Sequence, residues 1–172
     1  MSRELSSVFL LAIAFVPMLL EARHSVANER RLRAAGAIEP AGDVYTAMQF
    51  AYPACFLTMV FEAWLRGSTL GGEALTGSAL FAAAKALKYW AIAVLGERWT
   101  FRVLVPPSSE RTLRGPYRVL RHPNYVAVVG ELVGFALIAS APVAGALAVA
   151  GFGALLLARI RVEERALGLR SR

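Results

Sequence analysis

The chain has 172 residues, of which 57% are hydrophobic, and it carries a formal charge of +7 from 19 Lys and Arg against 12 Asp and Glu. This hydrophobic content exceeds what a soluble core of this size requires, and the charges are segregated from the apolar stretches. A soluble domain and a disordered basic tail are therefore excluded. Because the arginines lie beside apolar stretches, we expect no nucleic-acid partner and read them as flanks of membrane spans.

Four apolar stretches follow one another along the chain, and each can be measured against the roughly 20 helical residues that cross a hydrocarbon core. Residues 5–20 predict a short first span. The alternative is a cleaved secretory signal, but the arginines that follow favour a retained span. Residues 44–65 and 74–95 are each long enough for one crossing. The charged residues inside the four stretches are Glu62, Lys85, Lys88 and Glu131.

The last apolar stretch, residues 125–158, is too long for one span, because its 34 residues would extend about 51 Å as a single helix. Ser140-Ala141-Pro142 provides a break near its middle. We therefore expect a hairpin of two short helices, over 125–140 and 142–158. The chain is predicted to be an all-α polytopic membrane protein of about five transmembrane helices, forming one domain over residues 1–172.

Three segments rich in arginine set the expected orientation. They contain Arg23, Arg30, Arg31 and Arg33, then Arg98, Arg102, Arg111, Arg114, Arg118 and Arg121, and finally Arg159, Arg161, Arg165, Arg170 and Arg172. With five spans, all three segments fall on one side of the membrane. The positive-inside tendency then places the N-terminus outside and the long loops and C-terminus in the cytoplasm, as in a bacterial inner membrane.

The densest polar segment, residues 111–125, is punctuated by Gly115-Pro116 and His122-Pro123. One interpretation is a basic interfacial loop that touches lipid phosphates. The other is a binding platform for a small polar ligand, because a loop fixed by prolines leads directly into a span. A second constellation, Arg159 with Glu163 and Glu164, follows the last span. It forms either solvated ion pairs or a pair of carboxylates facing His122.

Charged residues within the spans are costly and normally pair with one another. Lys85 lies near the middle of its span, and Lys88 and Glu131 have similar estimated depths. We expect Glu131 to pair with Lys88, so that reversing either charge destabilises the protein and reversing both restores it. The alternative for Lys88 is that it extends to the interface. Glu62 is expected to be interfacial.

Several common sites are not indicated by the sequence. No Gly-rich phosphate loop and no G-x-S-x-G motif is present. The chain has two histidines and one cysteine, so we expect no metal site. Composition and pattern thus predict a small helical membrane protein with a polar cytoplasmic site, without naming its reaction.

The order and spacing of these polar residues resemble a known family. They are Gly115-Pro116-Tyr117-Arg118, Arg121-His122-Pro123-Asn124-Tyr125, the apolar hairpin, and Arg159 before Glu163-Glu164. This signature, over residues 87–167, resembles the isoprenylcysteine carboxyl methyltransferase family, which is related to the phospholipid methyltransferases. The N-terminal half is similar to a bacterial branch associated with O-methylation of alkylpyrones or alkylresorcinols. The residues that carry this second likeness are Ser25, Asn28, Glu29, Gly36, Ala37, Glu39 and Tyr45.

The resemblance implies S-adenosyl-L-methionine as cofactor, held on the cytoplasmic side. The positions it assigns to cofactor binding are Tyr117, Arg118, His122, Pro123, Tyr125, Glu163 and Glu164. The chain departs from the family at Ala127, where many relatives have glycine. Ala127 is the nearest small substitute, so close helix packing remains plausible there.

Methyl transfer needs an oxygen aligned with the methyl group and water kept out. A cation would fix an ionised oxygen, and Arg159 is our first choice for it, with Arg121 second. Glu131 is the third residue that we expect to be catalytic. The acyl or prenyl tail is expected to enter from the membrane, with Trp99 and Arg102 at the entrance. We expect a lipid-like substrate and membrane lipids as partners, and the oligomeric state stays open.

The predicted acceptor is an alkylpyrone or alkylresorcinol. Prenylcysteine carboxyl methylation is the alternative that the family signature supports equally. Phospholipid N-methylation would need a proton acceptor, and loss of activity on neutralising Glu131 would help to distinguish it. A non-enzymatic membrane scaffold leaves the spacing of the signature unexplained.

Overall fold

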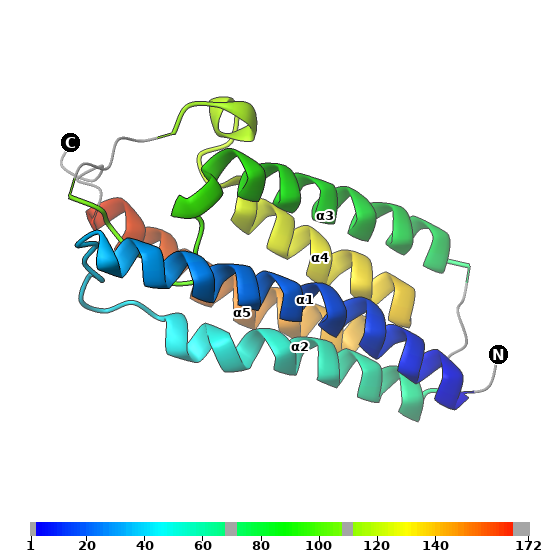
Figure 1. Ribbon diagram of the computed structural model, residues 1–172. Helices are drawn as coiled ribbons and strands as arrows, with labels where there is room; N and C mark the ends of the chain where they lie inside the picture. The colour runs from blue at the N-terminus through cyan, green and yellow to red at the C-terminus, as the bar shows by residue number, and fades with distance from the viewer. Residues whose placement is uncertain (1–2, 68–71, 108–111, 167–172) are drawn as a thin grey trace.

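The computed structural model describes residues 3–67, 72–107 and 112–166, which form a bundle of helices that run alternately up and down (Figure 1). The elements are α1 (Arg3–Ala34), α2 (Tyr45–Leu65), α3 (Ala74–Leu95), the short 3₁₀ helices η1 (Gly96–Arg98) and η2 (Gly115–Arg118), α4 (Pro123–Ala139) and α5 (Pro142–Ala166). In the described ranges, the β structure is one isolated antiparallel bridge between Ile38 and Val105. The prediction of an all-α fold is confirmed. Arg111, Arg170 and Arg172 lie outside the described residues, as does position 167 of the signature.

The first and last helices are longer than their apolar stretches. The sequence indicated a loop after residue 20, but α1 continues to Ala34 through good helix formers and stops before Gly36, whose φ is +84°. Similarly, α5 carries Arg159 and both neighbouring glutamates on its last turns. The break between α4 and α5 lies where the sequence predicts it: Ser140 adopts a left-handed conformation with φ 51°, and Pro142 begins the next helix.

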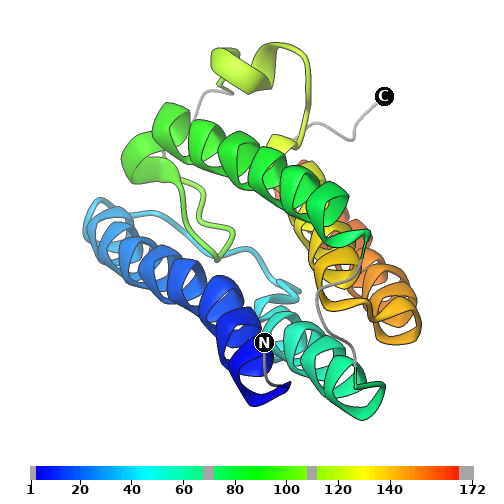
Figure 2. The same cartoon turned by 90° about the vertical axis from the view of Figure 1, so that its right-hand side faces the viewer.

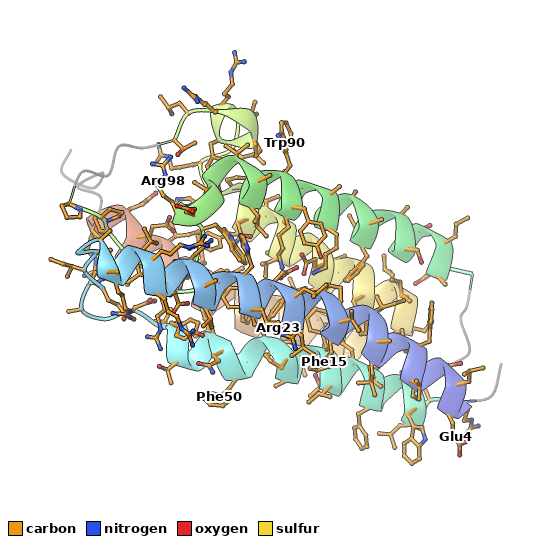
Figure 3. All side chains as sticks on the ribbon, viewed as in Figure 1. Glu4, Phe15, Arg23, Phe50, Trp90 and Arg98 are labelled. Carbon is orange, nitrogen blue, oxygen red and sulfur yellow. The ribbon has the colours of Figure 1, made fainter. Side chains whose placement is uncertain are left out.

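The path of the chain places the arginine-rich segments at one end of the bundle. In Figure 1, the C-terminal ends of α1, α3 and α5 gather at that end with the N-terminal ends of α2 and α4. Among the described residues, three helices are long and apolar enough to cross a membrane: α1, Ala74–Arg98 and α5. Helix α4 is shorter, and α2, over the stretch expected to be the second span, is not among the three. Phe50 and Trp90 point away from the bundle and are 69% and 55% exposed (Figure 3). An apolar outer surface of this kind suits contact with lipid.

Helices α3 and α4 lie alongside each other in both views (Figures 1 and 2), and small residues allow their close approach. A Cβ added at Gly134 would stand 2.7 Å from the Phe81 backbone nitrogen and 3.0 Å from the Gly77 carbonyl oxygen. Gly130 faces Ala84 in the same way, with a Cβ 3.0 Å from that of Ala84. Gly130 and Gly134 are spaced as in the G-x-x-x-G motif of membrane helix pairs.

Substitution of Gly134 by alanine is expected to lower the free energy of unfolding by about 1–3 kcal/mol, because the new methyl group meets backbone atoms of α3 that cannot yield alone. Gly151→Ala in α5 is the matched control, since a Cβ there has nothing within 4 Å. Thermal unfolding of both variants in detergent measures the difference. Equal midpoints would contradict this account of the α3–α4 contact.

Candidate functional site

A cavity of about 610 Å³ lies at the arginine-rich end of the bundle. It is bounded by α1, α2, α4 and α5, by Lys88 and Leu95 of α3, and by residues 99–106, the segment after η1 that we call the strap. Apolar side chains such as Phe15, Met18 and Met48 line one part, whereas His122 and Glu163 line a polar part. A second groove, of about 880 Å³, lies between α4 and α5 at the opposite end and contains none of the predicted site residues.

The loop before α4 brings His122 against the carboxylates of α5. Pro123 occupies the first turn of α4, and His122 before it lies outside the helical region, with φ −132° and ψ 67°. The His122 ring stacks on Tyr125 with centroids 5.4 Å apart, and its nitrogens lie 3.7 Å from Glu163 and 3.5 Å from Glu164. The structure therefore brings the loop histidine and both glutamates together, as one of the two sequence interpretations requires.

Tyr125 connects this group to Arg159. The Arg159 Nε donates to the Tyr125 hydroxyl at 3.0 Å, and the hydroxyl donates to Glu163 at 2.7 Å. The guanidinium also donates to Asp43 at 3.1 Å and to the carbonyl oxygen of Phe101 in the strap. The side chains of Arg159 and Asp43 are only 6% and 5% exposed. Sequence reasoning missed Asp43, which no local pattern marks.

Polar residues of α1 and its following connection fix the strap by its backbone. Asn28 donates to the carbonyl oxygens of Gly96 and Trp99 at 3.1 and 2.8 Å. Ser25 accepts from the Phe101 N–H at 2.8 Å, and Asp43 accepts from the Val103 N–H at 3.1 Å. Two of the residues that carried the bacterial-branch likeness thus hold the wall of the cavity.

Ion pairs hold the outer side of the strap. Arg102 pairs with Glu39 at 2.7 Å and Glu29 at 3.5 Å, and it lies over the Tyr45 ring at 4.3 Å. Burial alone would raise the pKa of Glu39, but hydrogen bonds from Arg33 and Arg102 lower it below its ordinary value. The carboxylate therefore stays ionised and the strap stays joined to the α1–α2 connection at neutral pH.

The remaining predicted site residues fall into two groups. Arg159, Tyr117, Pro123 and Arg121 line the cavity, although Arg121 is exposed and pairs with Glu164 at 3.4 Å. Burial raises the pKa of Tyr117, so its hydroxyl stays protonated. The side chains outside the cavity lining are Arg118, which is exposed, Glu164, which faces His122, and Glu131.

Glu131 belongs to a buried group of four charges, the ion square, made of Glu21, Lys85, Lys88 and Glu131. Each carboxylate contacts both ammonium groups, at 2.9 to 3.1 Å. The predicted pairing of Lys88 with Glu131 is confirmed, and Lys88 is 2% exposed rather than extended to the interface. Tyr52, which lines the cavity, donates to Glu131 and so joins the square to the site.

Glu62 and Trp99 make contacts that the sequence did not indicate. Glu62 accepts from the Val143 and Ala144 N–H groups at 3.3 and 2.6 Å, so it caps the start of α5. Trp99 lines the cavity but is 3% exposed and stacks on His24. Over the described ranges, no group of three or more His, Cys, Asp or Glu side chains is placed to hold a metal ion.

Among the described residues of the cavity wall, one buried polar side-chain atom has no protein partner. The Oδ1 of Asn124 is buried without a hydrogen bond, beside His122 and Tyr125. Buried acceptors are nearly always satisfied, so a donor from a bound water or a ligand is expected at this atom. With the Glu163 carboxylate and the His122–Tyr125 rings, it suits a ligand that carries N–H or O–H donors, positive charge and a flat ring.

Comparison with known proteins identifies the group to which this architecture belongs. A model of the isoprenylcysteine carboxyl methyltransferase (ICMT) family matches residues 77–168. The chain belongs to this family. Membership supports a membrane methyltransferase, and every residue predicted to bind the cofactor lies within the matched region.

Two bacterial relatives extend the likeness over nearly the whole chain. The uncharacterized protein YpbQ of Bacillus subtilis is 31% identical over 158 residues, which cover 92% of this chain and 94% of the relative. An uncharacterized protein of Haemophilus influenzae is 27% identical over 159 residues, covering 92% and 90%. No solved structure matches the chain. The likeness includes the N-terminal half, which contributes Asp43 and Glu21.

Proposed function

We propose that the chain is an S-adenosyl-L-methionine-dependent O-methyltransferase acting on a lipophilic acceptor with an acidic hydroxyl, of the alkylpyrone or alkylresorcinol kind. The observation that carries the proposal is one cavity with a polar part at His122, Tyr125 and Glu163 and an apolar part walled by α1 and α2. A charged cofactor and an alkylated ring need these two environments side by side.

The polar part fits the cofactor by its donor and acceptor set. The Glu163 carboxylate would receive the amino or ribose hydroxyl groups, the unpartnered Asn124 Oδ1 would accept a further donor, and the stacked His122 and Tyr125 rings would provide a flat face. When bound, the cofactor supplies an electrophilic methyl group on a positively charged sulfur. The nearby carboxylates offset that charge in a site with little water.

Arg159 is the chain's proposed cation for the acceptor oxygen. Arg159 lines the cavity, and three protein partners hold its guanidinium in one orientation. A guanidinium has five N–H donors, so donors remain for an ionised oxygen. Arg121 is less suitable because its side chain is 62% exposed. Residues of the strap line this end of the cavity, where they would help to keep water from the reacting groups.

Glu131 acts, in this proposal, through Tyr52 and Lys88, which contact it and line the cavity, because Glu131 itself does not line the cavity. The substrate tail would occupy the apolar part between α1 and α2, with Trp99 and Arg102 of the strap beside it. We propose a bacterial inner membrane with the N-terminus outside and the site in the cytoplasm, in keeping with the arginines gathered at this end.

Membranes that contain the protein, labelled S-adenosyl-L-methionine and a panel of acceptors test the function. The panel holds an alkylpyrone, an alkylresorcinol, a prenylcysteine and a phosphatidylethanolamine. We expect label in the alkylpyrone or alkylresorcinol. Label in the prenylcysteine would favour carboxyl methylation, the activity that the family is named for. Transfer to none of the four, together with no cofactor binding, would overturn the enzyme assignment.

A further inference from the structure

Asp43 is a buried carboxylate in the connection between α1 and α2, outside the region matched by the family. Its Oδ1 accepts from the Arg159 guanidinium at 3.1 Å and from the Tyr45 N–H at 3.2 Å, and its Oδ2 accepts from the Val103 N–H at 3.1 Å. Burying a charge is costly unless it is paired and hydrogen-bonded, and here both oxygens are used. One carboxylate thus joins α2, the strap and α5.

The contacts continue from Asp43 to the polar part of the cavity. The Arg159 Nε donates to the Tyr125 hydroxyl, so the lone hydroxyl proton is directed at Glu163, 2.7 Å away. Glu163 also faces the Nδ1 of His122 at 3.7 Å. Asp43 therefore holds the Arg159 guanidinium, and Arg159 orients the Tyr125 hydroxyl. That hydroxyl in turn fixes the position of the Glu163 carboxylate.

We propose that Asp43 is a positioning residue for cofactor binding, acting through Arg159 and Tyr125 on the Glu163 carboxylate. The inference rests on the proposed function, because it takes Glu163 to receive the cofactor. Without the Asp43 charge, Arg159 loses its only charged partner within hydrogen-bond distance among the described residues, and the guanidinium is free to turn toward Glu163. The Tyr125 hydroxyl then no longer accepts from the Arg159 Nε, the contact that directs its proton at Glu163.

A double-mutant cycle between D43N and Y125F tests the path, with labelled S-adenosyl-L-methionine as the binding probe and detergent-purified full-length protein. D43N alone is expected to weaken cofactor binding about tenfold, and to raise the KM for the cofactor by the same factor while kcat falls less. In the Y125F background, the same substitution is expected to change binding less than twofold, since the hydroxyl through which it acts is absent.

Glu39→Gln is the matched control. Glu39 lies in the same connection and also joins the strap, through Arg102, but it has no link to Tyr125. Cofactor binding by E39Q is expected to stay within about twofold of the unaltered protein. If D43N does not yield folded protein, D43E keeps the charge while moving the carboxylate by one methylene, and it enters the same cycle.

The outcomes separate the inference from the proposed function. If D43N lowers the affinity for the cofactor equally with and without Y125F, Asp43 acts independently of Tyr125. If D43N leaves the affinity unchanged, Asp43 does not position the site. Either result overturns the inference and leaves the proposed function standing. If the unaltered protein binds no cofactor, the proposed function fails first and the inference fails with it.

Discussion

Replacement of Glu131 by glutamine is expected to lower the free energy of unfolding by about 3–5 kcal/mol. Glu131 is fully buried and contacts Lys85 at 3.1 Å and Lys88 at 2.9 Å. Its neutralisation leaves two ammonium groups against the single carboxylate of Glu21, in the apolar middle of the bundle. A buried charge without compensation is among the most destabilising changes that a single substitution can make.

The geometry of the ion square changes the expected result of double substitutions. Each carboxylate contacts both ammonium groups, so exchanging the charges of Lys88 and Glu131 would create two contacts between like charges. Lys85 would face a lysine at position 131, and Glu21 would face a glutamate at position 88. K88E/E131K is therefore not expected to restore stability, unlike an exchange within an isolated pair. E131Q/K88M removes one charge of each sign and should be milder than E131Q alone.

Denaturant unfolding in detergent, followed by circular dichroism, measures these variants. Glu97→Gln is the control, because Glu97 forms an ion pair with Arg31 in which both side chains are more than half exposed. It should change stability by less than about 1 kcal/mol. Recovery of stability in K88E/E131K would contradict the square and restore the simple pair.

The ion square shows which contacts the sequence can predict and which it cannot. Counting residues into each span was enough to match Lys88 with Glu131, because both lie within apolar stretches where a charge stands out. Glu21 does not stand out in the same way, because it follows the first apolar stretch directly. The structure continues α1 past that point and turns Glu21 inward. Composition shows where apolar residues end, and not where a helix ends.

The residues of the candidate site also divide into those that the sequence indicates and those that only the structure reveals. The loop residues around His122 and the two glutamates of α5 were found because each group is contiguous and matches a spaced family signature. Asp43 was missed because its partner Arg159 lies 116 positions away and neither neighbour of Asp43 marks it. Arg118 was included because it shares that loop, yet its side chain is exposed and outside the cavity lining. Contacts between distant segments depend on packing, which spacing along the chain does not record.

The replacement H122A is expected to weaken binding of S-adenosyl-L-methionine at least about 100-fold while the protein stays folded. The ring stacks on Tyr125 and stands between Glu163 and Glu164, so its loss removes a face of the site and the group that separates two carboxylates. Stability should change little, because the His122 side chain makes no hydrogen bond that caps α4. Equilibrium binding and thermal unfolding in detergent measure the two effects.

Arg114→Gln is the control for H122A, because Arg114 is an exposed cation that precedes η2 in the same loop and lies outside the cavity lining. If binding depended only on the positive charge of this loop, R114Q would weaken it as well. We expect R114Q to bind the cofactor within about twofold of the unaltered protein. If H122A binds the cofactor as tightly as the unaltered protein, the cofactor binds elsewhere. If H122A unfolds, His122 is needed for the stability of the protein. If H122A loses affinity for the cofactor and R114Q does not, the affinity depends on the His122 ring and its contacts with Tyr125 and the two glutamates.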